Sequence, residues 1–202
     1  MEVEGRGMRF TGERIVPGVT NDSRDVSAHL ARYVWAMHPF CTHKMVLDAA
    51  AGTFYGAQIL SWAATHVWGI DIEPAAIEYG MEMYQTENMS FVIGDVTDMP
   101  FPEGMFDVVV SFETIEHLSN PEKFVDEVWR VLRPNGVFIV SAPEQSGSAW
   151  HFRDYNDEEL EALLLRFPHR QYYGQGFGQE HLILKNQIPN SAHDTHIYVA
   201  GK

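Results

Sequence analysis

The stretch VLDAAAGTFYGA, Val46–Ala57, decides the fold. It begins inside a short apolar strand, Met45–Ala49, and continues through alanine and glycine into a segment that reads as a helix. Small residues between a strand and a helix let the backbone approach a bound nucleotide, so the stretch is typical of a cofactor-binding turn. An alanine-rich structural corner is the alternative that this stretch alone leaves open.

Apolar strands and amphipathic helices alternate along most of the chain. Continuous apolar strands that alternate with helices predict a parallel sheet covered on both faces, with ligands at the carboxyl ends of the strands. The further strands are predicted at 66–71, 89–95, 105–112 and 136–143, and the helices between them at 57–66, 74–85 and 121–134.

The two ends of the chain add to this core. A helical periodicity at 25–38 precedes the first strand, while a helix at 156–167 and two strands at 170–177 and 195–201 follow the last. The connection between these two strands is too short for a crossover helix, so they form a closing antiparallel hairpin. The prediction is a doubly wound, Rossmann-like α/β fold with seven strands, mostly parallel, a reversed last strand and an extra N-terminal helix.

The length of 202 residues predicts one domain. Within it we expect an N-terminal lead-in and helix at 1–40 and a cofactor-binding core at 44–145. A substrate-side helix and the closing hairpin follow at 146–202.

Composition excludes several classes of function. The formal charge of −14 argues against extended contact with nucleic acid, so we expect a small-molecule or glycan substrate. No apolar run approaches the roughly 20 residues of a membrane span, and the N-terminus reads as neither a signal nor a transit peptide, so cytoplasm is the expected location. Cys41 is the only cysteine, which excludes an internal disulfide.

Two aspartates follow the first two strands. Asp71 comes 23 residues after Asp48, near the spacing of about 20 at which an acidic residue binds ribose hydroxyls in dinucleotide sites. For Asp71 the alternative is an ordinary cap of the helix that begins at Pro74.

Four motifs occur in a specific order: VLDAAAG, GIDIEP, GDVTDMPFPEGMFDVVVSFETIEHL and RVLRPNGVFIVSAPE. Together they resemble class I S-adenosylmethionine-dependent methyltransferases across about residues 44–145. FTGERIVPG and HLARYVWA, nearer the N-terminus, resemble methyltransferases associated with bacterial glycan and O-antigen assembly. The first motif of the family is usually Asp-x-Gly-x-Gly-x-Gly; here Ala50 and Phe54 replace two glycines, and the Phe54 ring must point away from the ligand or cover it.

The resemblance implies S-adenosylmethionine as cofactor and a role for each matching residue. Asp48 would lie near the methionine end of the cofactor, and Ala50 and Gly52 would line the cofactor. Asp71 would hold both ribose hydroxyls, and Ile72 would pack on the adenine. Asp95 would accept from the adenine amino group beside Val96, although an aspartate there is also a common turn residue.

The segment ETIEH places Glu113, Glu116 and His117 on one face if it is helical. These side chains suit Mn²⁺, Fe²⁺, Zn²⁺ or Mg²⁺. The pattern is similar to that of metal-dependent small-RNA 2′-O-methyltransferases, in which a later histidine completes the site, and His151 stands at a comparable place. The competing hypotheses are that His117 is a general base oriented by Glu113 or Glu116, and that the segment is a solvated helix start.

These observations predict O-methylation of a saccharide or other small polyol hydroxyl. Alternatives are a different N- or O-acceptor, a non-catalytic cofactor-binding or regulatory domain, which the missing glycines would fit, and a nicotinamide oxidoreductase on a similar sheet. His29 and Tyr33, on the first helix, are further candidates for the cofactor pocket, although an ordinary core or surface histidine is the commoner outcome.

Overall fold

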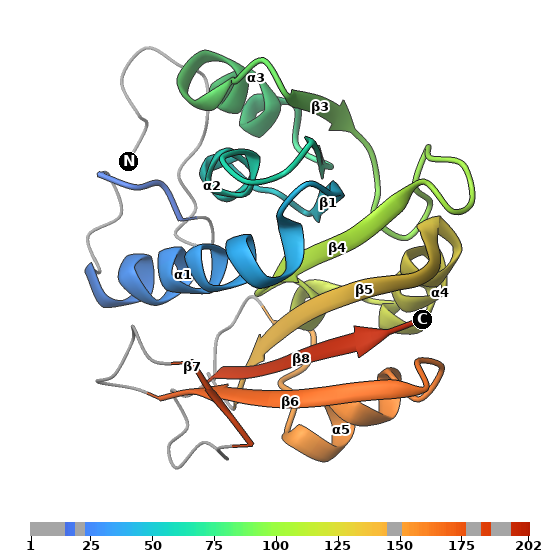
Figure 1. Ribbon diagram of the computed structural model, residues 1–202. Helices are drawn as coiled ribbons and strands as arrows, with labels where there is room; N and C mark the ends of the chain where they lie inside the picture. The colour runs from blue at the N-terminus through green and yellow to red at the C-terminus, as the bar shows by residue number, and fades with distance from the viewer. Residues whose placement is uncertain (1–14, 19–22, 145–150, 177–182, 187–194) are drawn as a thin grey trace.

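A computed structural model describes residues 15–18, 23–144, 151–176, 183–186 and 195–202. Within these residues the chain forms one eight-stranded sheet with the strand order β3-β2-β1-β4-β5-β8-β6-β7 (Figure 1). Strands β1 to β5 are parallel, and β8 runs antiparallel to both of its neighbours, β5 and β6. The strands are β1 Met45–Ala49, β2 His66–Asp71, β3 Met89–Ile93, β4 Phe106–Phe112, β5 Leu132–Pro143, β6 His169–Gln175, β7 Ile183–Lys185 and β8 Thr195–Gly201.

Helices cover both faces of the sheet. The α-helices are α1 Ser23–Ala36, α2 Tyr55–Ser61, α3 Pro74–Tyr84, α4 Pro121–Val131 and α5 Asp157–Leu163. A short π-helix, η1 Met37–Cys41, continues α1, and a 3-10 helix, η2 Ile115–His117, follows β4. Among the described helices, none is both long enough and apolar enough to cross a membrane.

Alternate residues of the central strands β1 and β4 enter two different cores. Val46 and Val110 pack with α1, α2 and α3, whereas Leu47 and Val109 pack with α4 and α5. This two-sided burial explains why the strands read as continuous apolar runs. Asp48 follows Val46 by two residues, so its side chain points to the face covered by α1 and α2.

The sequence prediction of a doubly wound, mostly parallel sheet with an antiparallel closing pair is confirmed. The described sheet has eight strands rather than seven, because Ile183–Lys185 pairs with the outer edge of β6. This strand has only three residues, which is too short for a periodic pattern that sequence reasoning could assign to a strand.

Helix ends differ from the predictions by a few residues. Helix α4 ends at Val131 instead of residue 134, and β5 begins directly at Leu132. Pro134 disfavours helical backbone at the residue before it, which explains the earlier end. The first helix begins at Ser23, two residues earlier than predicted. Residues 10–14, which begin the segment with the glycan-associated resemblance, lie outside the described residues.

Candidate active site

The candidate cofactor residues gather at the carboxyl ends of adjacent parallel strands. Asp48 lies in β1, Asp71 ends β2, and Asp95 follows β3. Glu113 directly follows β4, the other neighbour of β1. The topology therefore brings residues from four separate sequence segments to one edge of the sheet, where open α/β sheets bind their ligands.

The loop after β1 contains three left-handed residues at alternate positions. The φ angles are 62° at Ala50, 58° at Gly52 and 69° at Phe54. These are the three positions at which the resembling family usually carries glycine. The loop therefore has the backbone of a glycine-rich turn, with each of the two non-glycine residues in a conformation that costs roughly 1–2 kcal/mol.

The Phe54 ring points away from the ligand side of this loop. It is fully buried and packs against Phe91 of β3, with ring centroids 4.7 Å apart. Two glycines provide its space: a Cβ atom at Gly69 would lie 2.3 Å from the ring, and one at Gly80 would lie 2.7 Å from it. The replacement of glycine by phenylalanine thus fills the core instead of covering the cofactor site.

Asp71 ties the loop to the second strand. Its Oδ2 accepts a hydrogen bond from the Gly52 amide at 2.8 Å, and its Oδ1 accepts from the Glu73 amide at 3.0 Å. Helix α3 is capped by Glu73, whose side chain accepts from the Ala75 amide, so the alternative role of Asp71 as the helix cap is wrong.

Ile72 and Asp95 are both exposed at the same edge. The Ile72 side chain is 67% exposed, which leaves an apolar surface beside the Asp71 carboxylate. Asp95 accepts from the amide and the hydroxyl of Thr97, at 2.7 and 2.8 Å, so it forms the turn that sequence reasoning gave as its alternative role. Val96 is buried beside it.

Asp48 is the most buried carboxylate of this group. Its Oδ1 accepts a hydrogen bond from the Tyr33 hydroxyl at 3.1 Å, and its Oδ2 has no hydrogen-bond partner among the described residues. Burial, with a smaller contribution from the charge of Asp71, raises the pKa of Asp48 to about 7, although the Tyr33 hydrogen bond acts in the opposite direction. A buried carboxylate oxygen without a partner fits a cationic ligand group, such as the amino group of S-adenosylmethionine.

A second cluster lies just beyond β4. Glu116, His117 and His151 place one ligand atom each within 4.8 Å of one another. The Glu116 side chain is 1% exposed and neither of its carboxylate oxygens has a hydrogen-bond partner among the described residues. Burial, followed by the charge of Glu113, raises the pKa of Glu116 well above its usual range. His151 Nδ1 lies 2.8 Å from an oxygen of Asp154, so its Nε2 is the ring atom left for a metal.

Glu113 does not belong to this cluster. The expected helix is only the three-residue η2, and Glu113 itself has φ of 52°, so the i, i+3, i+4 geometry is not formed. Its Oε1 accepts a hydrogen bond from Ser141 at 2.7 Å and lies 3.7 Å from Arg32 Nη2. The structure therefore separates the four predicted metal ligands into a group of three and a carboxylate with other partners.

Helix α1 supplies residues that sequence reasoning missed or ranked low. Arg32 is almost fully buried and donates to Gln175 at 2.6 Å. His29 Nδ1 lies 2.5 Å from the Tyr55 hydroxyl, and burial, with the charge of Arg32, lowers the pKa of His29 well below its usual value. The signal was present, because His29, Arg32 and Tyr33 have the i, i+3, i+4 spacing of one helix face.

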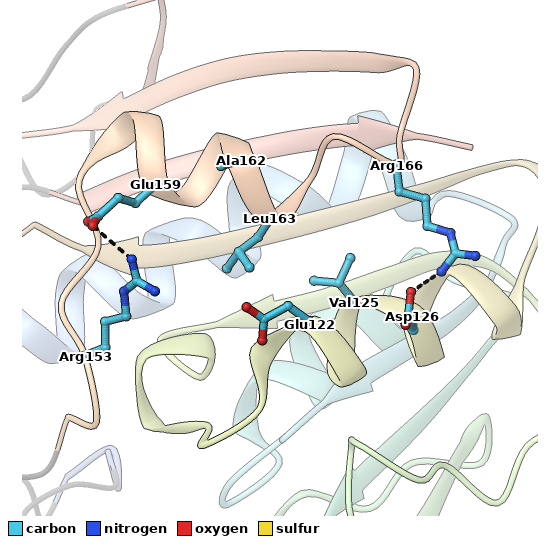
Figure 2. Close-up of a pocket in the computed structure, with 8 residues that line it drawn as sticks. All are labelled: Glu122, Val125, Asp126, Arg153, Glu159, Ala162, Leu163 and Arg166. Carbon is cyan, nitrogen blue, oxygen red and sulfur yellow. Dashed lines mark hydrogen bonds and ion pairs between the residues drawn. The ribbon is translucent and has the colours of Figure 1, made fainter.

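A groove of about 380 Å³ lies between α4 and α5 (Figure 2). Its apolar floor includes Val125 and Leu163, and the ion pairs Arg153–Glu159 and Arg166–Asp126 lie at its ends. None of its lining residues belongs to either candidate cluster.

Comparison with known proteins agrees with this geometry. Residues 47–140 match the methyltransferase-domain family. This region is a class I S-adenosylmethionine-dependent methyltransferase domain. A Mycolicibacterium smegmatis protein named as a probable S-adenosylmethionine-dependent methyltransferase is 34% identical over 164 residues, which are 77% of this chain and 63% of that protein. A similarly named Mycobacterium tuberculosis protein is 30% identical over 167 residues, 78% of this chain and 60% of that protein.

The chain thus spans about three fifths of the length of these curated relatives. Among solved structures, an S-adenosylmethionine-dependent methyltransferase from Aquifex aeolicus superposes with a TM-score of 0.67 at 17% identity, covering 88% of this chain and 93% of that one. Haemonchus contortus phosphoethanolamine N-methyltransferase 2, solved with S-adenosyl-L-methionine, superposes with a TM-score of 0.61 at 20% identity. The superposition covers 71% of this chain and 37% of that one. These likenesses show that the chain has the same fold as these methyltransferases.

Proposed function

We propose that the protein transfers the methyl group of S-adenosylmethionine to a hydroxyl oxygen of a small molecule. The sulfonium charge already activates the methyl group, so the enzyme mainly aligns the acceptor. A hydroxyl acceptor also needs help in losing its proton, from a base or from a metal ion. The observation that carries the oxygen assignment is the cluster of Glu116, His117 and His151 beside the end of β4.

The cofactor would occupy the edge formed by β1, β2 and β3. Asp48 would face the amino group at its methionine end, and the carboxylate of Asp71 would accept from the ribose hydroxyls. The exposed Ile72 side chain supports apolar contact with the adenine. The complete proposed set is Asp48, Ala50, Gly52, Asp71, Ile72, Asp95 and Val96.

The second cluster has the donors of a metal site. One carboxylate and two imidazoles suit Zn²⁺, Fe²⁺ or Mn²⁺ better than Mg²⁺, which prefers oxygen ligands. The Asp154 carboxylate beside His151 supports this reading, because metal-binding histidines usually donate their other ring nitrogen to such a group. A divalent ion there would lower the pKa of a nearby hydroxyl.

Without a metal, His117 would be the general base. Glu116 is the carboxylate beside it, since Glu116 Oε1 lies 3.9 Å from His117 Nε2. Glu113 would then act from the Arg32 side, as a carboxylate that binds or orients the acceptor. Its left-handed backbone at the end of β4 supports a functional role, because such strain concentrates at active sites.

A saccharide or small polyol is the acceptor class that we propose first. The charge of −14 and the N-terminal sequence resemblance support it. The names of relatives indicate different acceptors: a rice protein named as a probable tocopherol O-methyltransferase is 36% identical over 102 residues, and an ajmaline N-methyltransferase of Rauvolfia serpentina is 37% identical over 76 residues. Hydroxylated lipids are therefore the comparison class in any assay.

The test is methyl transfer from labelled S-adenosylmethionine to matched panels of sugars, polyols, hydroxylated lipids and amines. We expect product with a hydroxyl panel, loss of turnover after chelation and recovery with Zn²⁺, Fe²⁺ or Mn²⁺. The variant His151→Ala should lose the metal response, whereas His169→Ala, an exposed histidine on β6, should keep it. Transfer only to amines would contradict the oxygen assignment, and full activity after exhaustive chelation would contradict the metal.

A further inference from the structure

Tyr33 of α1 lies against the cofactor loop from outside the sequence motif. Its ring rests on the backbone of Gly56 at the start of α2, where a Cβ atom would lie only 2.1 Å from the ring. Its hydroxyl donates to Asp48 Oδ1 at 3.1 Å. The glycine therefore creates the space that allows a helix preceding the first strand to hold the carboxylate of the first motif.

Among the residues that the structure describes, the other titratable groups around Asp48 provide no positive charge directly at its carboxylate. Asp71 at the end of β2 adds negative charge, which raises the pKa of Asp48. Burial, with a smaller contribution from the charge of Asp48, raises the pKa values of Tyr55 in α2 and Cys41 in η1, so both are neutral near pH 7. From the neighbouring strand β4, the residue in register is Val110.

Arg32, next to Tyr33 on α1, is the nearby cation, but it is engaged elsewhere. Its guanidinium donates to Gln175 and lies 3.7 Å from Glu113. Within the described residues, the Tyr33 hydroxyl is thus the one group that stabilises the ionised form of Asp48 through a hydrogen bond.

We propose that Tyr33 is a positioning residue for cofactor binding, which holds the Asp48 carboxylate ionised and oriented toward the cationic amino group of the methionine moiety. The inference rests on the proposed cofactor site. It adds to that site a residue of helix α1 that the family motifs do not contain.

The inference has a pH signature. Asp48 must be ionised to bind an ammonium group, and its pKa of about 7 means that it is protonated at lower pH. Affinity for a ligand with the amino group should therefore rise as pH increases through about 7. Removal of the Tyr33 hydroxyl favours the protonated carboxyl, so the midpoint should move to higher pH by about one unit.

Two ligands separate this role from a general effect on the pocket. S-adenosylhomocysteine carries the amino acid portion, and methylthioadenosine lacks it while retaining the adenosine. We would titrate both calorimetrically between pH 5.5 and 8.5 into the wild-type protein and into Tyr33→Phe, which keeps the ring on Gly56. The matched control is Tyr173→Phe, which removes a hydroxyl from β6.

We expect Tyr33→Phe to weaken S-adenosylhomocysteine binding about 10-fold near pH 7.5, with the midpoint moved upward and methylthioadenosine binding changed less than about twofold. Equal losses for both ligands, or an unchanged midpoint in Tyr33→Phe, would overturn the inference while leaving the cofactor site intact. Failure of the wild-type protein to bind either ligand would overturn the proposed function and the inference with it.

Discussion

The ring of Phe54 packs directly against Gly80, and the lack of a side chain at this glycine lets helix α3 approach the cofactor loop that carries the ring. A Cβ atom at position 80 would lie 2.7 Å from Cδ2 and 2.8 Å from Cβ of Phe54. Because Phe54 also fills the space at Gly69, one aromatic ring packs the loop against both β2 and α3. The shape of the cofactor loop therefore depends on two glycines outside it.

Gly80→Ala should destabilise the protein although alanine is the better helix former. The added methyl group overpacks against Phe54, which typically costs about 1–3 kcal/mol and exceeds the propensity gain of about 1 kcal/mol. Urea denaturation would measure this change. Met81→Ala, on the exposed part of the same helix, is the control, with a change of about 0.5 kcal/mol or less. An unchanged midpoint for Gly80→Ala would show that the helix can move away from the ring.

Exchange of alanine and glycine within the loop should have opposite effects at neighbouring positions. Ala50 and Gly52 have nearly the same φ, 62° and 58°. Ala50→Gly releases left-handed strain and should stabilise the protein by up to about 1 kcal/mol, reduced by the entropy of an added glycine. Gly52→Ala should destabilise it by about 1 kcal/mol or more. Thermal denaturation would measure both variants. A change in stability of the same sign in the two variants would contradict this account.

The sequence predicted which residues lie together at the carboxyl edge of the sheet, because the signals that place them are local. A strand followed by small residues, with an aspartate after each of the first two strands, specifies Asp48, Ala50 and Asp71 at one edge once the sheet is parallel. The Phe54 ring could not be placed, because its space is created by Gly69 and Gly80, which are distant in the sequence.

The second cluster shows the limit of spacing arguments. The i, i+3, i+4 pattern predicted a helix that would bring Glu113 together with Glu116 and His117. The chain instead makes a left-handed residue at Glu113 and a single 3-10 turn, and His151 joins from a segment after β5. Three of the four candidate residues lie together, and the backbone at Glu113 determines that this residue is the one left out.

The stability of the protein without cofactor should depend on the ionisation of Asp48. Its folded pKa, about 7, lies above the unfolded value of 3.8, so the folded state binds more protons between these values. The free energy of unfolding should therefore decrease as pH rises through this window, by at most about 1.4 kcal/mol per pH unit for this group. In urea denaturation between pH 5 and 8, the free energy of unfolding of Asp48→Asn should depend less on pH than that of Asp126→Asn, a control at an exposed aspartate. Parallel pH profiles for the two variants would argue against a shifted Asp48.

Metal affinity should depend on a residue that is not a ligand. The Asp154 carboxylate lies 2.8 Å from His151 Nδ1, so Asp154→Asn should leave the ligand set intact and weaken Zn²⁺ or Co²⁺ binding by about 10- to 100-fold. Glu113→Gln, outside the cluster, should keep the affinity within about twofold. Competition with a chromophoric chelator would measure both. Equal affinity in Glu116→Gln, His117→Ala and the wild type would exclude this cluster as the metal site.

Asp71→Asn should weaken binding of the adenosine portion of the cofactor. The change removes the negative charge and one acceptor, while the Gly52 and Glu73 amides compete for the single remaining carbonyl oxygen. We expect methylthioadenosine affinity to fall by about 10- to 100-fold, because hydrogen bonds to a charged group contribute about 1.5–3 kcal/mol. Glu73→Gln, which changes the adjacent carboxylate at the start of α3, is the control and should alter the affinity little.

A distorted loop would also weaken binding, so the deciding comparison is with the 2′- and 3′-deoxy analogues of methylthioadenosine. The wild-type protein should discriminate against both analogues, and Asp71→Asn should lose that discrimination. A variant that binds all three ligands more weakly, but with the wild-type ratios, would show that Asp71 shapes the loop and does not contact the ribose.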